Sequence, residues 1–186
     1  VWELAATWQS LDIPVTIRNP SAVSRALPAA WIEARKAGVQ TAMTDLYSNA
    51  LKDLPLTGAA QITRAEMMLL SPIYESALAE DIKGTDLIFA RSVATGKPIA
   101  SLAGNLLERV IVNGFAKNTL SPNATELLSQ GKLGETLVRA IVTAEQAANG
   151  DLRDISKVIA LLRHTGLEST ARQLGLNLLL IDRLRP

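Results

Sequence analysis

The sequence contains no cysteine and only one histidine among its 186 residues. Without cysteine the chain has no disulfide bond, no thiol nucleophile and no cysteine ligand for a metal. With only His164, a site built on two histidines is excluded. This residue falls in the last turn of a predicted helix, where an imidazolium interacts favourably with free carbonyl groups. We therefore predict no catalytic histidine, no metal ion and no cofactor.

Aromatic residues and net charge are also scarce. Aromatics make up 4% of the chain and hydrophobic residues 48%, so Leu, Ile, Val and Ala must form the interior, which favours packed helices. A weak case of strand-like alternation, over 13–17, is interrupted by Pro14. A formal charge of +1 provides no long-range field that would attract nucleic acid or an anionic membrane. We predict an all-α protein that does not bind nucleic acid.

No apolar run reaches the roughly 18 residues that a membrane span needs, so we predict a soluble protein in the cytoplasm or periplasm. The chain starts at Val1 without a signal-peptide pattern, and we expect it to be part of a longer protein. Its length suits one helical domain over 1–186, with a possible division into 1–82 and 83–186.

The clearest pattern lies between Gly150 and Pro186, where two apolar helical faces are separated by Gly166. The spacing predicts a helical hairpin. In its second helix, four leucines fall off the main stripe, so that helix is apolar on nearly all sides. Such a helix is either buried centrally or covered by a partner. The four leucines form our candidate interaction surface: Leu176, Leu179, Leu180 and Leu184.

Helical spacing continues upstream, with short connections that indicate stacked antiparallel αα-hairpins, either a superhelical array or an irregular bundle. Residues 110–112 could alternatively form a short strand. In the helix expected over 133–148, the apolar side consists of Leu133, Leu137, Ile141 and either Ala144 or Ala148. We expect a connector over 12–20 and a short turn over 22–26, and further helices over 1–11, 29–36, 40–52, 58–72, 87–94, 98–112 and 121–130.

Residues 133–184 carry an apolar helix, a His-Thr-Gly-Leu-Glu turn and then Thr-Ala-Arg-Gln-Leu-Gly. In this order they resemble the closing hairpins of tetratricopeptide-like bacterial helical proteins, many of which have no assigned activity. The resemblance implies a helical-repeat architecture and assigns no chemistry.

The segment Thr170–Leu176 also resembles the turn of bacterial helix-turn-helix DNA-binding domains. In those domains the residues after the turn are polar, because they read base edges through hydrogen bonds. Here Leu178, Leu179 and Leu180 occupy these positions. We therefore predict a buried helix, and DNA binding is the least favoured function.

No set of polar residues converges on a recognisable catalytic motif. We predict a non-catalytic helical scaffold that binds another protein or its own copy. The alternative is an all-α, glycan-cleaving enzyme with a carboxylic acid in a cleft, for which Glu33, Glu66 and Glu75 are the candidate acids.

Overall fold

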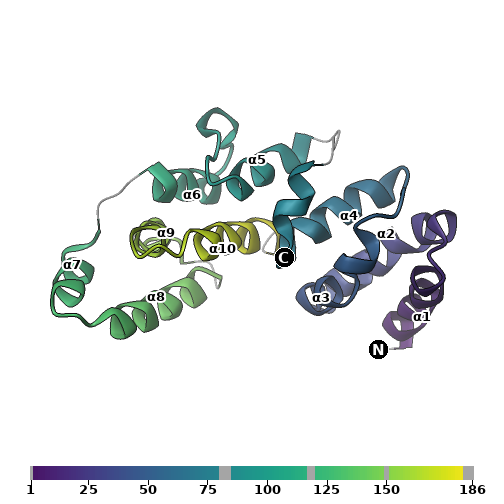
Figure 1. The fold of residues 1–186 in the computed structure, drawn as a ribbon, viewed down its shortest axis with the longest axis horizontal. Helices are drawn as coiled ribbons and strands as arrows, with labels where there is room; N and C mark the ends of the chain where they lie inside the picture. Colours follow the sequence, from purple (N-terminus) through teal and green to yellow (C-terminus); the bar gives the residue numbers. More distant parts are fainter. Residues whose placement is uncertain (1, 80–84, 117–119, 149–150, 182–186) are drawn as a thin grey trace. The chain divides into compact units, whose positions relative to one another are not determined.

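The computed structural model describes residues 2–79, 85–116, 120–148 and 151–181 (Figure 1). Over these residues the protein is all-helical and contains no strand, as predicted. The helices are α1 Trp2–Thr16, α2 Pro20–Lys36, α3 Gln40–Leu51, α4 Ala59–Leu70, η1 Tyr74–Ala79, α5 Thr85–Ala94, η2 Ala100–Leu102, α6 Leu106–Ala116, α7 Pro122–Ser129, α8 Leu133–Ala148, α9 Ile155–His164 and α10 Glu168–Ile181, where η marks a 3-10 helix.

The chain forms two compact units, and the boundary falls inside α5, between Arg91 and Ser92. Unit 1 contains α1 to α4, and unit 2 contains α6 to α10. The sequence suggested a division after residue 82, which lies nine residues before this boundary. Each unit has its own buried apolar residues and is described separately below.

Unit 1 differs from the prediction at two prolines. The helix α1 continues past Pro14 to Thr16, where a connector was expected. The helix α2 runs unbroken through Pro28, where a new helix was expected to begin after a short turn over 22–26. A proline inside a helix removes one backbone hydrogen bond. The stripe buried by α2 nevertheless runs on both sides of Pro28, and its burial offsets that loss. The buried residues of α2 are Val23, Leu27, Ala30, Trp31 and Ala34.

In unit 2 the two helices predicted for the end of the chain are confirmed, as α9 and α10, but Figure 1 shows α9 end-on and α10 lengthwise, so they cross at a steep angle and do not lie antiparallel. Gly166 has a φ of 81°, a left-handed conformation that suits glycine, and it ends α9. The N–H of Leu167 donates to the carbonyl of Leu162 at 2.8 Å and closes the turn. The predicted helix over 98–112 begins later, at Leu106, and the alternative strand at 110–112 is wrong because these residues lie within α6.

The α6 and α9 helices pack closely at Gly114. A Cβ atom on this glycine would lie 2.7 Å from Ile159 Cβ and 3.1 Å from the carbonyl oxygen of Ser156. Both distances are too short for ordinary van der Waals contact. The absence of a side chain at residue 114 is therefore what allows α6 to approach α9.

We predict that Gly114→Ala lowers the free energy of unfolding by about 1–2 kcal/mol, because the added methyl group overpacks this contact. The control is Asn113→Ala in the same helix at an exposed position, which should raise stability by about 0.5 kcal/mol through helix propensity. Urea unfolding followed by circular dichroism measures both. Equal effects of the two substitutions would contradict the assigned packing.

Candidate functional site

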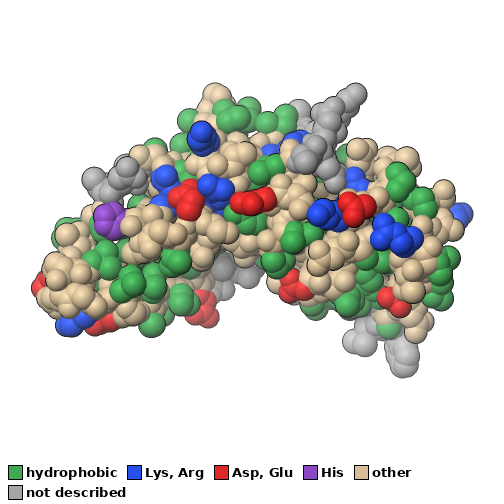
Figure 2. All heavy atoms as spheres, in the orientation of Figure 1, with side chains coloured by type: hydrophobic (Ala, Val, Ile, Leu, Met, Phe, Trp, Pro, Cys, Tyr) green, Lys and Arg blue, Asp and Glu red, His purple; other side chains and the backbone are tan. Residues whose placement is uncertain are grey.

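The helix α8 exposes most of its large apolar side chains. It packs against α7, α9 and α10, but among its described side chains only the small Thr136 and Ala140 are buried. Val138 is 60% exposed, Ile141 67% and Val142 50%. Figure 2 shows hydrophobic side chains gathered at the surface over α8. The α9 helix does the opposite and buries Ile155, Val158, Ile159, Leu161 and Leu162.

Helical spacing explains why these residues share one face. Val138, Ile141 and Val142 follow one another at steps of three and one, which places them on one side of a 3.6-residue helix. We call these three residues the α8 stripe. On its polar border, Arg139 donates to Glu135 at 2.7 Å, one turn apart. The stripe itself contains no charged side chain.

An apolar groove of about 280 Å³ runs between α8, α9 and α10. Thr170 is the only polar residue in its lining, and Ile141 belongs to both the groove and the α8 stripe. The two features therefore form one continuous apolar surface. The residues of this α8–α10 groove are Leu137, Ala140, Ile141, Ala144, Val158, Leu162, Leu167, Thr170 and Leu174.

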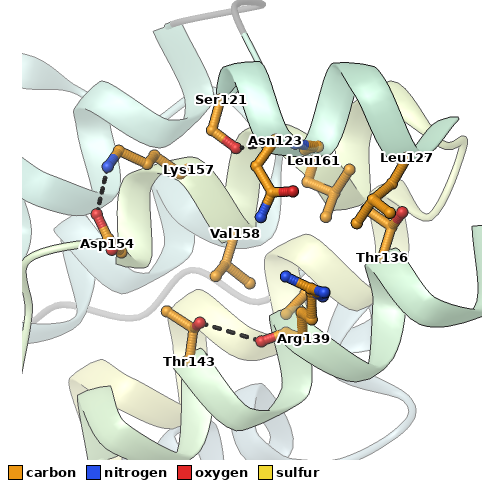
Figure 3. Close-up of a pocket in the computed structure, with 12 residues that line it drawn as sticks. Ser121, Asn123, Leu127, Thr136, Arg139, Thr143, Asp154, Lys157, Val158 and Leu161 are labelled. Carbon is orange, nitrogen blue, oxygen red and sulfur yellow. Dashed lines mark hydrogen bonds and ion pairs between the residues drawn. The ribbon is translucent and has the colours of Figure 1, made fainter. Parts of the chain in front are cut away.

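A second hollow, of about 300 Å³, lies between α7, α8 and α9 (Figure 3). Several of its polar groups already have partners. Ser121 Oγ accepts from the N–H of Ala124 at 3.2 Å, Thr143 Oγ1 donates to the carbonyl of Arg139 at 3.0 Å, and Lys157 pairs with Asp154. Each of these contacts joins residues three or four positions apart and stabilises its own helix. The hollow therefore presents fewer groups for a ligand than its composition suggests.

The candidate acids of the alternative function, a glycan-cleaving enzyme, lie in unit 1. Both carboxylate oxygens of Glu66 are occupied: Arg35 Nη1 donates to Oε1 at 2.6 Å, and Trp31 Nε1 donates to Oε2 at 3.1 Å. Glu66 thereby joins α4 to α2. Glu33 pairs with Lys36 at 2.7 Å and borders a shallow hollow, and Glu75 is exposed in η1. Among these described contacts, none brings two of the three acids together.

The predicted interaction surface on the terminal helix needs correction. Leu176, Leu179 and Leu180 are all buried, at 0%, 3% and 1% exposure, and Leu184 lies outside the described residues. Because α10 is apolar on several sides, its side chains are enclosed within the chain, which was the other of the two predicted placements. Leu178, at a position where a recognition helix would read bases, is also buried, as predicted.

Ile141 was predicted to lie on the apolar side of the helix over 133–148, which would face the interior. In the structure its side chain is exposed on α8. The signal that could have revealed the α8 stripe is the pair Val138 and Val142, which fall off the predicted inward side. A second apolar side on a helix needs a second covering neighbour, from the same chain or from a partner.

In the described part of the chain, no group of three or more His, Asp or Glu side chains is arranged to hold a metal ion. Nor does any helix within it combine the length and apolarity that crossing a membrane requires. No protein-family model matches the sequence, and comparisons with curated proteins and with solved structures give no match.

Removing the Glu66 carboxylate should destabilise unit 1, because Glu66→Ala removes the group that accepts from Arg35 Nη1 and from the Trp31 indole. We expect a loss of about 1–3 kcal/mol in the free energy of unfolding. Glu33→Ala removes a more exposed ion pair and should cost at most about 0.5 kcal/mol. Urea unfolding followed by tryptophan fluorescence tests this order, and a larger loss from Glu33→Ala would refute the role of Glu66.

The contact between Asp151 and Arg153 can be tested through the pKa of Asp151. Its carboxylate accepts hydrogen bonds from the Arg153 side chain and backbone, which lower the pKa of Asp151 from 3.8 to about 2. The folded state therefore favours the ionised form, and this contribution, present above pH 4, is lost as the pH falls through 2. NMR titration should give a midpoint near 2 that rises in Arg153→Gln but not in Lys157→Gln. A wild-type midpoint near 4 would contradict the contact.

Proposed function

We propose that the chain is a non-catalytic protein-interaction module, and that the α8 stripe and the α8–α10 groove together bind an amphipathic helix of a protein partner. The observation that carries this proposal is the outward orientation of the large apolar side chains of α8. Singly exposed apolar residues are normal on a protein surface, whereas a continuous apolar patch beside a groove is typical of an interaction site.

The chemistry of the surface favours a helix as the occupant. The groove runs between packed helices and has no charged residue in its lining, so it suits an apolar face whose residues recur at steps of three and four. A partner of this kind would place its polar residues outward, next to the Glu135–Arg139 pair at the border of the stripe.

The small apolar area that a partner could bury on this surface predicts weak binding. Complete burial of a Val or Ile side chain contributes about 1.5–3 kcal/mol, so covering the half-exposed residues of the α8 stripe contributes about 1 kcal/mol each. Groove residues such as Leu167, which is 38% exposed, add to this sum. The loss of translational and rotational freedom offsets a large part of the gain. A weak, reversible interaction is therefore expected.

No described contact favours the alternative of a glycan-cleaving enzyme. Such an enzyme needs two carboxyl groups facing each other across a cleft. Glu66 instead connects two helices through Arg35 and Trp31, and Glu33 is paired with its neighbour Lys36.

The probe for this proposal is a fluorescein-labelled amphipathic peptide made of Leu, Glu and Lys, with leucines at steps of three and four. We expect the 186-residue chain to bind it, and expect Ile141→Asp and Leu167→Asp each to weaken binding at least about tenfold, since a buried carboxylate opposes apolar contact. Fluorescence anisotropy measures the affinity, and circular dichroism verifies that the variants fold.

The matched control is Ile62→Asp, which changes a 45% exposed isoleucine on α4 in unit 1 and should leave peptide binding unchanged. Equal loss from all three variants, or no peptide binding by the wild type, would contradict the proposed site.

A further inference from the structure

This inference rests on the proposed function and names the partner. We propose that the α8 stripe binds a second copy of this chain, with the two α8 helices packed antiparallel about a two-fold axis. In such a homodimer the same surface is used twice, so it must be complementary to itself. Sequence spacing and charge placement on α8 both meet this condition.

The apolar positions of α8 are self-complementary when the axis passes midway between Val138 and Ile141. Val138 then lies level with Ile141 of the second copy, and Leu137 and Val142 flank this pair on opposite edges, next to Ile141 and Val138 of the second copy. The two-fold axis generates the reciprocal contacts. Every large apolar residue from 137 to 142 therefore meets an apolar residue, and three of these four side chains are at least half exposed in the single chain.

Charge placement favours the antiparallel orientation over the parallel one. Glu145 lies near the carboxyl end of α8, and in this register it faces Gly134 in the first turn of the second copy's α8. A helix N-terminus carries a partial positive charge that attracts a carboxylate, and the exposed Lys132 immediately precedes it. Parallel packing would instead place the two Glu145 residues side by side.

The antiparallel arrangement also keeps the two Glu145 carboxylates, one from each copy, far apart. With a rise of about 1.5 Å per residue, the eleven residues from 134 to 145 place the two Glu145 residues about 16 Å apart along the helices. This exceeds the screening length of about 8 Å at physiological ionic strength. The Glu135–Arg139 pair at the border is neutral in each copy. We expect a reversible dimer with a Kd on the order of 10–100 μM.

The test uses two complementary variants of the 186-residue chain, Val138→Lys and Ile141→Asp. Each alone places a charge opposite an apolar side chain and should shift sedimentation to the monomer, with at least a tenfold rise in Kd. Mixed together they should associate again, because Lys at 138 then faces Asp at 141 while the unchanged Ile141 of one chain meets the unchanged Val138 of the other. A parallel pair would not show this rescue.

A cross-link gives a second measurement, because the natural chain has no cysteine. A mixture of Val138→Cys and Ile141→Cys, oxidised under mild conditions, should yield more covalent dimer on a non-reducing gel than either variant alone. Both positions are exposed, so circular dichroism should show an unchanged fold. In the sedimentation experiment Ile62→Asp is again the control, and it should dimerise like the wild type.

The outcomes separate this inference from the proposed function. A wild type that stays monomeric at several hundred micromolar but binds the amphipathic peptide through Ile141 would overturn the second copy and keep the interaction site. Absence of both association and peptide binding would overturn both proposals. Association that resists Val138→Lys and Ile141→Asp, or no rescue on mixing, would show that the copies meet elsewhere or in another register and would refute the inference.

Discussion

Unit 2 depends on the close approach of α6 to α9, which the missing side chain of Gly114 permits. With α6 this near, Ile159 is fully enclosed. The helix α10 in turn lies close to the end of α5 at Gly175, where an added Cβ would lie 2.9 Å from Val93 Cγ1. The helix α9 is thereby the centre of the unit, and its large apolar side chains are buried. The position left for α8 is determined by what α6 and α10 have not already covered.

This constraint explains why α8 buries small residues and exposes large ones. It lies between two hollows, the one shared with α7 and the groove shared with α10, and Ala140 and Val158 line both. The contact between α8 and α9 is therefore narrow at this point. A narrow contact can enclose Thr136 and Ala140 but cannot enclose the valines and the isoleucine on the adjacent side of the helix. The exposed α8 stripe is thus a consequence of the packing around α9.

Sequence periodicity was sufficient for the helical class and for the two helices joined at Gly166, because apolar spacing and a left-handed glycine are local properties. It failed at Pro14 and Pro28, where burial of the surrounding stripe outweighs a lost hydrogen bond, and this gain depends on helices distant in sequence. It also misplaced Ile141. Spacing identifies which residues share a face of a helix, but not whether the rest of the fold supplies a neighbour for that face. For the same reason Leu176, Leu179 and Leu180 could be assigned to core or interface only from their exposure.

A second copy on the α8 stripe and a different helix in the α8–α10 groove would compete for Ile141, because this side chain belongs to both surfaces. A second copy that covers the stripe withdraws Ile141 from any other helix in the groove, so the two binding equilibria are linked. Partner affinity would then fall as the concentration of the chain rises above the dimer Kd, and a tight partner would in turn dissociate the dimer. The proposed weak self-association would shield an apolar helix from non-specific contacts and would leave the surface available to a partner with greater complementary area.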